Sequence, residues 1–230
     1  GAWEIMGSQK LSTPVLVYPS LYDRDQLPMP VSRVLGELVR RQQLQQDPFL
    51  VRGIRPYQLG DPVRDIHWAA TARTQEVQLR VKDYSARTRL LVVLNVQYQD
   101  MQLNHYIPDT QQPWIEEGIR LAASLCVHAL RSGLSAGLAS NMPLGDSQER
   151  TLLLPADGTA QEEELLAAFA GLTISCAQRF PVLLEELKAH TGMDILVLSR
   201  YDSESIQSGI RNLTDAGNQV TFHLLEGGTQ

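Results

Sequence analysis

The chain has 230 residues and a formal net charge of −6, with 43% hydrophobic and 20% charged residues. This composition is ordinary for a soluble globular protein, and the length suffices for one large domain or one domain with a smaller appended unit. No stretch approaches the roughly 18 unbroken apolar residues of a membrane span. Two cysteines, Cys126 and Cys176, make neither a disulfide framework nor a matched metal motif, and their apolar neighbours predict buried, reduced thiols.

The N-terminal part of the chain predicts a tether, a strand and a helix in that order. Residues 1–10 are expected to be a tether or a cloning remnant. Residues 11–18 have the pattern of a short edge strand that Pro14 interrupts. Ser32 is a suitable N-cap for an amphipathic helix that runs to about residue 46.

Residues 53–84 are richer in turn residues, arginine and paired charge than any other stretch. The sequence Gly60-Asp61-Pro62 indicates a turn. Glycine permits a positive φ angle, aspartate can hydrogen-bond to its own backbone, and proline fixes its φ angle. Apolar and polar residues then alternate over 77–82, which predicts a half-buried strand. The continuous apolar run that ends at residue 94 predicts a buried strand.

Helices and strands alternate through the rest of the chain. Asp109 or Thr110 can cap the first helix, and Thr159 with Glu162 has the spacing of a capping box for the second. This alternation predicts an α/β fold with a doubly wound, mostly parallel sheet and right-handed crossovers. The predicted helices are 113–131, 159–171, 181–190 and 203–216, and the predicted strands are 134–140, 150–154, 194–199 and 220–224.

Charge is unevenly distributed along the sequence. Residues 49–89 contain eight Arg or Lys and four Asp or Glu, a net charge of +4 that leaves −10 for the remaining residues. This asymmetry indicates that the basic region either meets an acidic partner or is paired internally. A nucleic-acid partner is not expected, because the chain is acidic overall and lacks interleaved lysines and aromatic residues.

The basic region supplies the candidate site residues. Asp61, Asp65 and His67 are candidates for metal ligands or for the catalytic cluster of a hydrolase. The favoured interpretation is a salt-bridged knot, in which the carboxylates of Asp61 and Asp65 pair with Arg55, Arg64 or Arg73. The planar guanidinium group of arginine suits such bidentate pairing with carboxylates. Tyr57 and Trp68 are expected to pack rather than to bind ligand. The sequence contains none of the known motifs for a catalytic nucleophile, a metal site or a phosphate-binding loop. We therefore expect that the chain is not an enzyme. The candidates are Arg55, Tyr57, Gly60, Asp61, Arg64, Asp65, His67, Trp68 and Arg73.

The basic region contains Arg52-Gly53-Ile54-Arg55-Pro56-Tyr57, Gly60-Asp61, Arg64, Ile66-His67-Trp68 and Thr71-Ala72-Arg73. In these residues and their spacing it resembles the signature of a bacterial family called "domain of unknown function 58". The resemblance implies a von Willebrand factor type A-like domain after the signature, a MoxR-type AAA+ ATPase as partner, and upstream membrane spans that hold the protein at the cytoplasmic face of the bacterial inner membrane. The implied domains are 1–10, a tether; 11–88, the signature region; and 89–230, the type A-like domain.

Type A domains hold Mg²⁺ with an Asp-x-Ser-x-Ser loop, and this sequence departs from that pattern. The corresponding positions are Asn95, Gln97 and Gln99, whose neutral amides supply no charge to a dehydrated cation. Arg200 adds a cation at the end of a later strand, and Asp100 is a carboxylate at a shifted position. We therefore expect a non-catalytic protein-interaction or assembly module without a cofactor. The alternative is a divalent-metal-dependent adhesion-type domain with non-standard ligands.

Overall fold

The computed structural model describes residues 17–45, 51–58, 61, 63, 66–82, 88–100, 102 and 107–225. Two sheets are present in this part of the chain, one of two strands and one of five. The strand predicted for residues 11–18 lies largely outside the described residues. Its two described members, Val17 and Tyr18, are not in a strand.

The five-stranded sheet confirms the predicted doubly wound, mostly parallel α/β fold. Its strand order is β5-β4-β3-β6-β7, and only the β4–β5 pair is antiparallel. Strand β3, the first strand of this sheet along the chain, lies at its centre, with β4 and β5 on one side and β6 and β7 on the other. The strands are β3 (Arg89–Leu94), β4 (Ser135–Pro143), β5 (Arg150–Ala156), β6 (Asp194–Ser199) and β7 (Gln219–Leu224).

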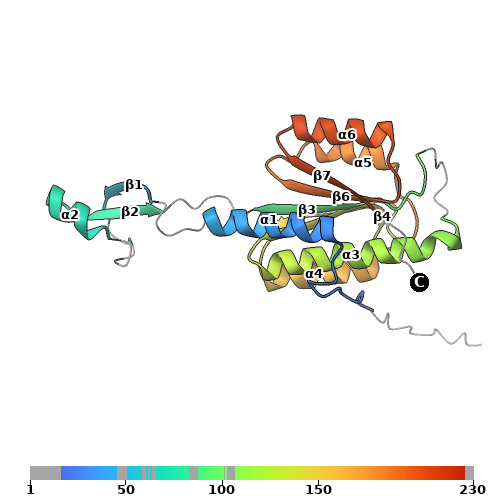
Figure 1. Cartoon of the computed structure of the whole chain (residues 1–230), viewed down its shortest axis with the longest axis horizontal. Helices are drawn as coiled ribbons and strands as arrows, with labels where there is room; N and C mark the ends of the chain where they lie inside the picture. The colour runs from blue at the N-terminus through green and yellow to red at the C-terminus, as the bar shows by residue number, and fades with distance from the viewer. Residues whose placement is uncertain are drawn as a thin grey trace, which may run out of the picture.

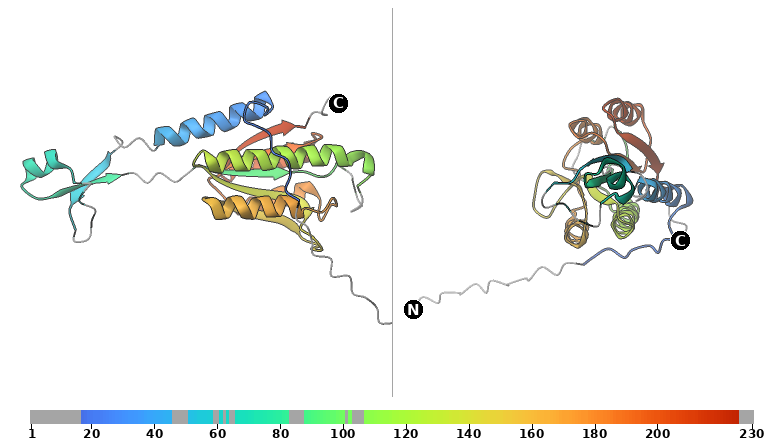
Figure 2. Two further views of the ribbon diagram at one scale, coloured as in Figure 1. Left: turned by 90° about the horizontal axis from the view of Figure 1, so that it is seen from below. Right: turned by 90° about the vertical axis from the view of Figure 1, so that its left-hand side faces the viewer.

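Helices cover both faces of this sheet, as the two views in Figure 2 show. Helices α1, α3 and α4 lie on one face, and α5 and α6 lie on the other (Figure 1). Alternation along β3 divides the core, because Leu90 and Val92 pack with the first group whereas Leu91 and Val93 pack with the second. The helices are α1 (Met29–Gln45), α3 (Gln112–Arg131), α4 (Thr159–Gly171), α5 (Phe180–Leu187) and α6 (Glu204–Asp215), and a 3-10 turn, η2 (Asp109–Gln111), precedes α3.

Three predicted N-terminal caps were wrong. Helix α1 begins at Met29, before Ser32, because prolines on either side of Met29 have the φ angle of a first helical turn. Thr159 is the first residue of α4, and its N-cap is Gly158 at φ 90°, which makes no side-chain cap. The residues expected to cap α3 form the 3-10 turn instead, and no side chain caps that helix.

Helix α1 belongs to the core of the main sheet although the signature residues follow it in sequence. Its residues Val31, Leu35 and Leu38 are buried in the same cluster as the β3 side chains. The buried Gln42 side chain accepts a hydrogen bond of 2.7 Å from the Thr88 backbone N–H, next to the start of β3. The chain therefore leaves the main body near Gln42 and returns to it near Thr88, and the hydrogen bond links these two points. The boundary expected between residues 88 and 89 stays a prediction.

The second sheet pairs β1 (Val51–Pro56) with β2 (Gln78–Lys82) in antiparallel fashion. A short helix, α2 (Trp68–Thr74), precedes β2, and Figure 1 shows these elements beyond the end of the main body. We call this group, residues 51–82, the signature unit. In the part of the chain that the structure describes, no helix is both long and apolar enough to cross a bilayer.

Candidate functional site

The signature unit is held together by few buried side chains. Ile66 and Leu79 are its buried hydrophobic residues among those described, and an isolated β-bridge joins them. A two-stranded sheet is marginally stable by itself, because it buries little apolar surface. Polar contacts therefore contribute a large part of its local order.

An ion pair fixes the turn that follows β1. The guanidinium group of Arg55 donates to both carboxylate oxygens of Asp61 at 2.7 Å, and Asp61 also accepts a hydrogen bond of 2.8 Å from the Gln58 N–H. Hydrogen bonding to Arg55 holds the pKa of Asp61 below its usual value and raises the pKa of Arg55. This geometry is the bidentate pairing expected of an arginine–carboxylate knot. Asp61 therefore stabilises the turn after β1 through its contacts with Arg55 and Gln58.

His67 connects α2 to the small sheet. Its Nδ1 accepts a hydrogen bond of 3.1 Å from the Ala70 N–H and so caps the helix. Its backbone N–H donates to the Gln78 carbonyl at 2.7 Å, while the Thr71 hydroxyl accepts from the Gln78 N–H at 3.0 Å. One ring nitrogen is therefore committed to a cap, which leaves only Nε2 for any other ligand.

The packing role predicted for Trp68 was wrong. This indole is 66% exposed at the first position of α2. Tyr57 is half-buried, and Arg73 is exposed in the last turn of the same helix. Exposure of a large aromatic residue on a small, basic unit is typical of an interaction surface rather than of a core.

Three of the candidate residues, Gly60, Arg64 and Asp65, lie outside the described residues. The predicted knot is thus established for its Arg55–Asp61 pair alone. The catalytic or metal cluster of Asp61, Asp65 and His67 stays a hypothesis. Two of its members are nevertheless engaged, one by a guanidinium group and one by a helix end.

The second candidate region is the carboxyl edge of the main sheet. Asn95 is buried there, and its Oδ1 accepts hydrogen bonds from the Gln97 N–H at 3.0 Å and the Asn141 amide at 3.2 Å. Its Nδ2 donates to the Ser199 hydroxyl at 3.0 Å. Asn141 in turn accepts from the Val96 N–H at 2.9 Å. Neutral polar groups from β3, β4 and β6 therefore satisfy one another at the place where a cation loop was considered.

The residues beside this network are also engaged. The Gln97 Oε1 accepts a hydrogen bond of 2.5 Å from the Phe180 N–H at the start of α5. Gln99 is exposed, and Asp100 accepts hydrogen bonds from the hydroxyls of Ser203 at 3.2 Å and Ser205 at 2.5 Å near the start of α6. This donor set does not fit a hard divalent cation, since the central amides are neutral and the carboxylate is hydrogen-bonded at a helix end. Metal-independent recognition stays a prediction.

Aromatic and sulfur groups surround the same edge. Arg200 lies over the Trp114 ring, with its guanidinium carbon 4.3 Å from the ring centroid, so this cation is used in a cation–π contact. Burial raises the pKa of Tyr201 to about 12 and that of Cys176 to about 11. Sequence reasoning missed Asn141 as a partner of Asn95. The available signal was a polar residue directly after the strand predicted for residues 134–140.

The geometry defines an α/β domain with a projecting signature unit, whose turn is fixed by an arginine–carboxylate pair, and with neutral polar groups at the carboxyl edge of the main sheet. A family model described as "Protein of unknown function DUF58" matches residues 53–192, which include most of the signature unit and most of the main sheet. The chain therefore belongs to this family. No curated protein matches it.

Proposed function

We propose that this chain is a non-catalytic protein-interaction module that uses its signature unit to dock an acidic surface of a protein partner. By family resemblance, the proposed partner is a MoxR-type AAA+ ATPase. The proposal includes a von Willebrand factor type A-like main body, held at the cytoplasmic face of the bacterial inner membrane as part of a membrane-associated protein.

The observation that carries the proposal is the exposure of apolar side chains on the signature unit. Trp68 is 66% exposed, and Ile54, Val63 and Val77 are also exposed. A unit with so little buried apolar surface gains stability when another protein covers it. Tryptophan is among the residues that most often dominate binding energy in protein interfaces.

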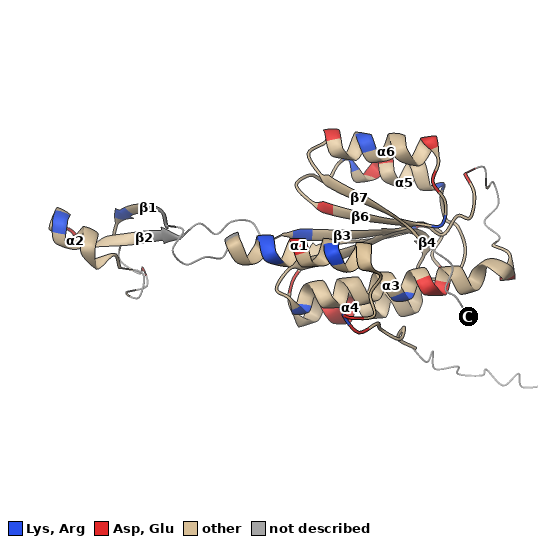
Figure 3. Cartoon of the chain, in the orientation of Figure 1, with Lys and Arg blue, Asp and Glu red and all other residues tan. Residues whose placement is uncertain are grey.

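Charge supports an acidic partner. Residues 51–82 contain six Arg or Lys and three Asp or Glu, whereas the whole chain has a net charge of −6. Figure 3 shows cationic positions on β1 and on α2, at the tip of the molecule. Because Arg55 is paired with Asp61, the exposed Arg73 is the described arginine most available for intermolecular contact. Such charges increase association rates and select partners.

The proposal is tested by binding between the purified chain and a MoxR-type ATPase from the same genome, measured by biolayer interferometry. Trp68→Ala is expected to weaken binding about tenfold or more, because an exposed indole contributes to the complex and little to folding. Arg73→Glu is expected to weaken binding and to reduce its dependence on salt. Arg211→Glu, an exposed position on α6, makes the same charge change away from the signature unit.

The outcome that overturns the docking surface is wild-type affinity for folded Trp68→Ala and Arg73→Glu. Absence of binding by the wild-type chain removes the ATPase as partner. An equal effect of Arg211→Glu would show that net charge, rather than the signature unit, determines binding.

A further inference from the structure

The two edges of the main sheet differ in how they are protected. Strand β5 contains Arg150 and Pro155, and its pairing with β4 has register shifts. Strand β7 has the sequence Gln-Val-Thr-Phe-His-Leu, with no proline and no charged residue, and its pairing with β6 is regular. Within the described residues, no strand pairs with the outer side of β7. Natural proteins usually protect such an edge with charge, proline or a bulge, or cover it with a helix or a loop.

The backbone groups of β7 that point away from the sheet can be assigned. The N–H of Gln219 donates to Met193 and the N–H of Leu225 donates to Ser199, so both point toward β6. Because backbone direction alternates along a strand, the intervening residues divide into two sets. The outward set consists of Val220, Phe222 and Leu224.

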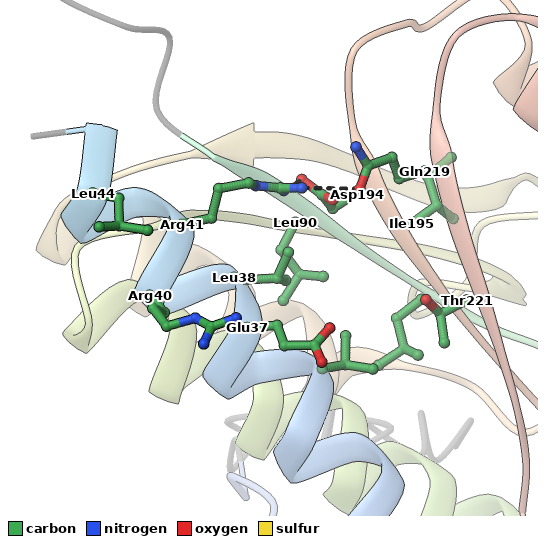
Figure 4. Close-up of a pocket in the computed structure, with 12 residues that line it drawn as sticks. Glu37, Leu38, Arg40, Arg41, Leu44, Leu90, Asp194, Ile195, Gln219 and Thr221 are labelled. Atoms are coloured by element: carbon green, nitrogen blue, oxygen red, sulfur yellow. Dashed lines mark hydrogen bonds and ion pairs between the residues drawn. The ribbon is translucent and has the colours of Figure 1, made fainter.

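Helix α1 runs beside this edge in the opposite direction. The Arg41 guanidinium group donates to Gln219 at 2.9 Å, at the start of β7. At the other end, Met29 of α1 lines a pocket with His223 and Leu225. Leu35, which is halfway between Met29 and Arg41, is therefore level with the middle of β7. A groove of about 380 Å³ lies between α1 and the sheet, lined by residues of β3, β6 and β7, with Glu37 on the helix side and Thr221 on the strand side (Figure 4). Helix α1 therefore covers a face of the sheet next to β7.

Two charges on α1 have the spacing that self-pairing requires. Arg33 and Glu37 lie on either side of Leu35, 3.4 Å apart in an i,i+4 pair, with side chains that are 82% and 59% exposed. A two-fold axis through the middle of β7 relates each helix to an antiparallel copy. Arg33 of one copy then faces Glu37 of the other, and the reverse contact forms by symmetry.

We propose that a second copy of this chain binds at β7, so that the two β7 strands pair in antiparallel fashion about Phe222. Val220 of one copy lies opposite Leu224 of the other, and the Phe222 residues lie opposite each other. All three outward residues then exchange N–H···O=C hydrogen bonds. The charges on α1 select this orientation. The proposal is independent of the docking role of the signature unit.

The first test removes one outward N–H and nothing that pairs with β6. Leu224 is 45% exposed, so Leu224→Pro deletes its outward donor, whereas Leu224→Thr loses the same apolar side chain but keeps the N–H. Sedimentation velocity at a series of micromolar concentrations measures the dimer. Relative to Leu224→Thr, Leu224→Pro is expected to raise the dimer dissociation constant about tenfold or more, since each copy loses a donor.

The second test uses charge and does not alter the strand. Glu37→Lys places a cation opposite Arg33 of the other copy, and Arg33→Glu places two carboxylates together. Each variant alone is expected to dimerise about tenfold more weakly than wild type, because two attractions become repulsions. An equimolar mixture of the two is expected to form heterodimers with near-wild-type affinity. Glu163→Lys, at an exposed position of α4, is the matched control and is expected to dimerise as the wild type does.

A wild-type chain that stays monomeric across this range overturns the proposal. So does a dimer that Leu224→Pro and Glu37→Lys leave unchanged, since another surface would then form it. If Leu224→Pro does not fold, the mixing experiment decides: failure of the two charge variants to associate with each other overturns the proposal.

Discussion

Gly137 provides a sharp test of the packing between β4 and β5. An alanine Cβ at this position would lie 2.4 Å from the Leu153 carbonyl oxygen and 2.6 Å from the Pro155 nitrogen. Both are backbone atoms, so no side chain can rotate away and the edge strand itself must shift. Inserting a methyl group into a packed core typically costs ~1–3 kcal/mol. We expect Gly137→Ala to lower the free energy of unfolding by about 3 kcal/mol, at the upper end of that range.

Gly36→Ala is the matched control, because Gly36 lies within α1 and a Cβ there has no heavy atom within 4 Å. Both changes restrict the unfolded chain equally, and alanine in a helix is favoured over glycine by ~0.5–1 kcal/mol. The two variants should therefore differ by roughly 4 kcal/mol in urea unfolding. Equal unfolding midpoints for the two variants would refute the close approach of β4 and β5.

Three further measurements probe the site residues. The lowered pKa of Asp61 means that its ion pair stabilises the fold fully above the unfolded pKa of about 4 and that this contribution is lost as pH falls through the folded value. Arg55→Gln should return the carboxyl titration of Asp61, followed by NMR, toward its usual range; an unchanged midpoint contradicts the pairing. His67→Ala should cost ~1 kcal/mol in local stability of α2 and speed hydrogen exchange at the amide it caps, whereas His67→Asn should retain protection. Burial raises the pKa of both the Cys126 and Cys176 thiols, so alkylation at neutral pH should be slow until urea unfolds the chain, and rapid labelling of the folded chain would contradict their burial.

Hydrophobic periodicity predicted most of the main body. The apolar run that became β3 and the alternation that became β2 are local patterns, and both lie where they were expected. Strand β1 was missed because Gly53 and Pro56 weaken its pattern, and its pairing with β2 is set across a long separation in sequence. Helix α2 was missed because it has only seven residues and its cap is a histidine.

The site was less accessible to sequence reasoning. Asn95 bonds to Ser199, which is 104 residues away, and no local pattern indicates that pairing. The charges of Arg55 and Asp61 did predict an ion pair, because they are close in sequence and chemically matched. The exposure of Trp68 was mispredicted, since a residue type favours burial only where enough neighbouring structure exists to cover it.

The hydrogen bond between Gln42 and Thr88 has a mechanical consequence. Any pull applied to the signature unit reaches the main body at two places simultaneously, the end of α1 and the start of β3. Force applied along β3 acts on all its hydrogen bonds to β4 and β6 at the same time, so these bonds resist it together. Force on the signature unit is therefore transmitted to β3, the central strand of the main sheet.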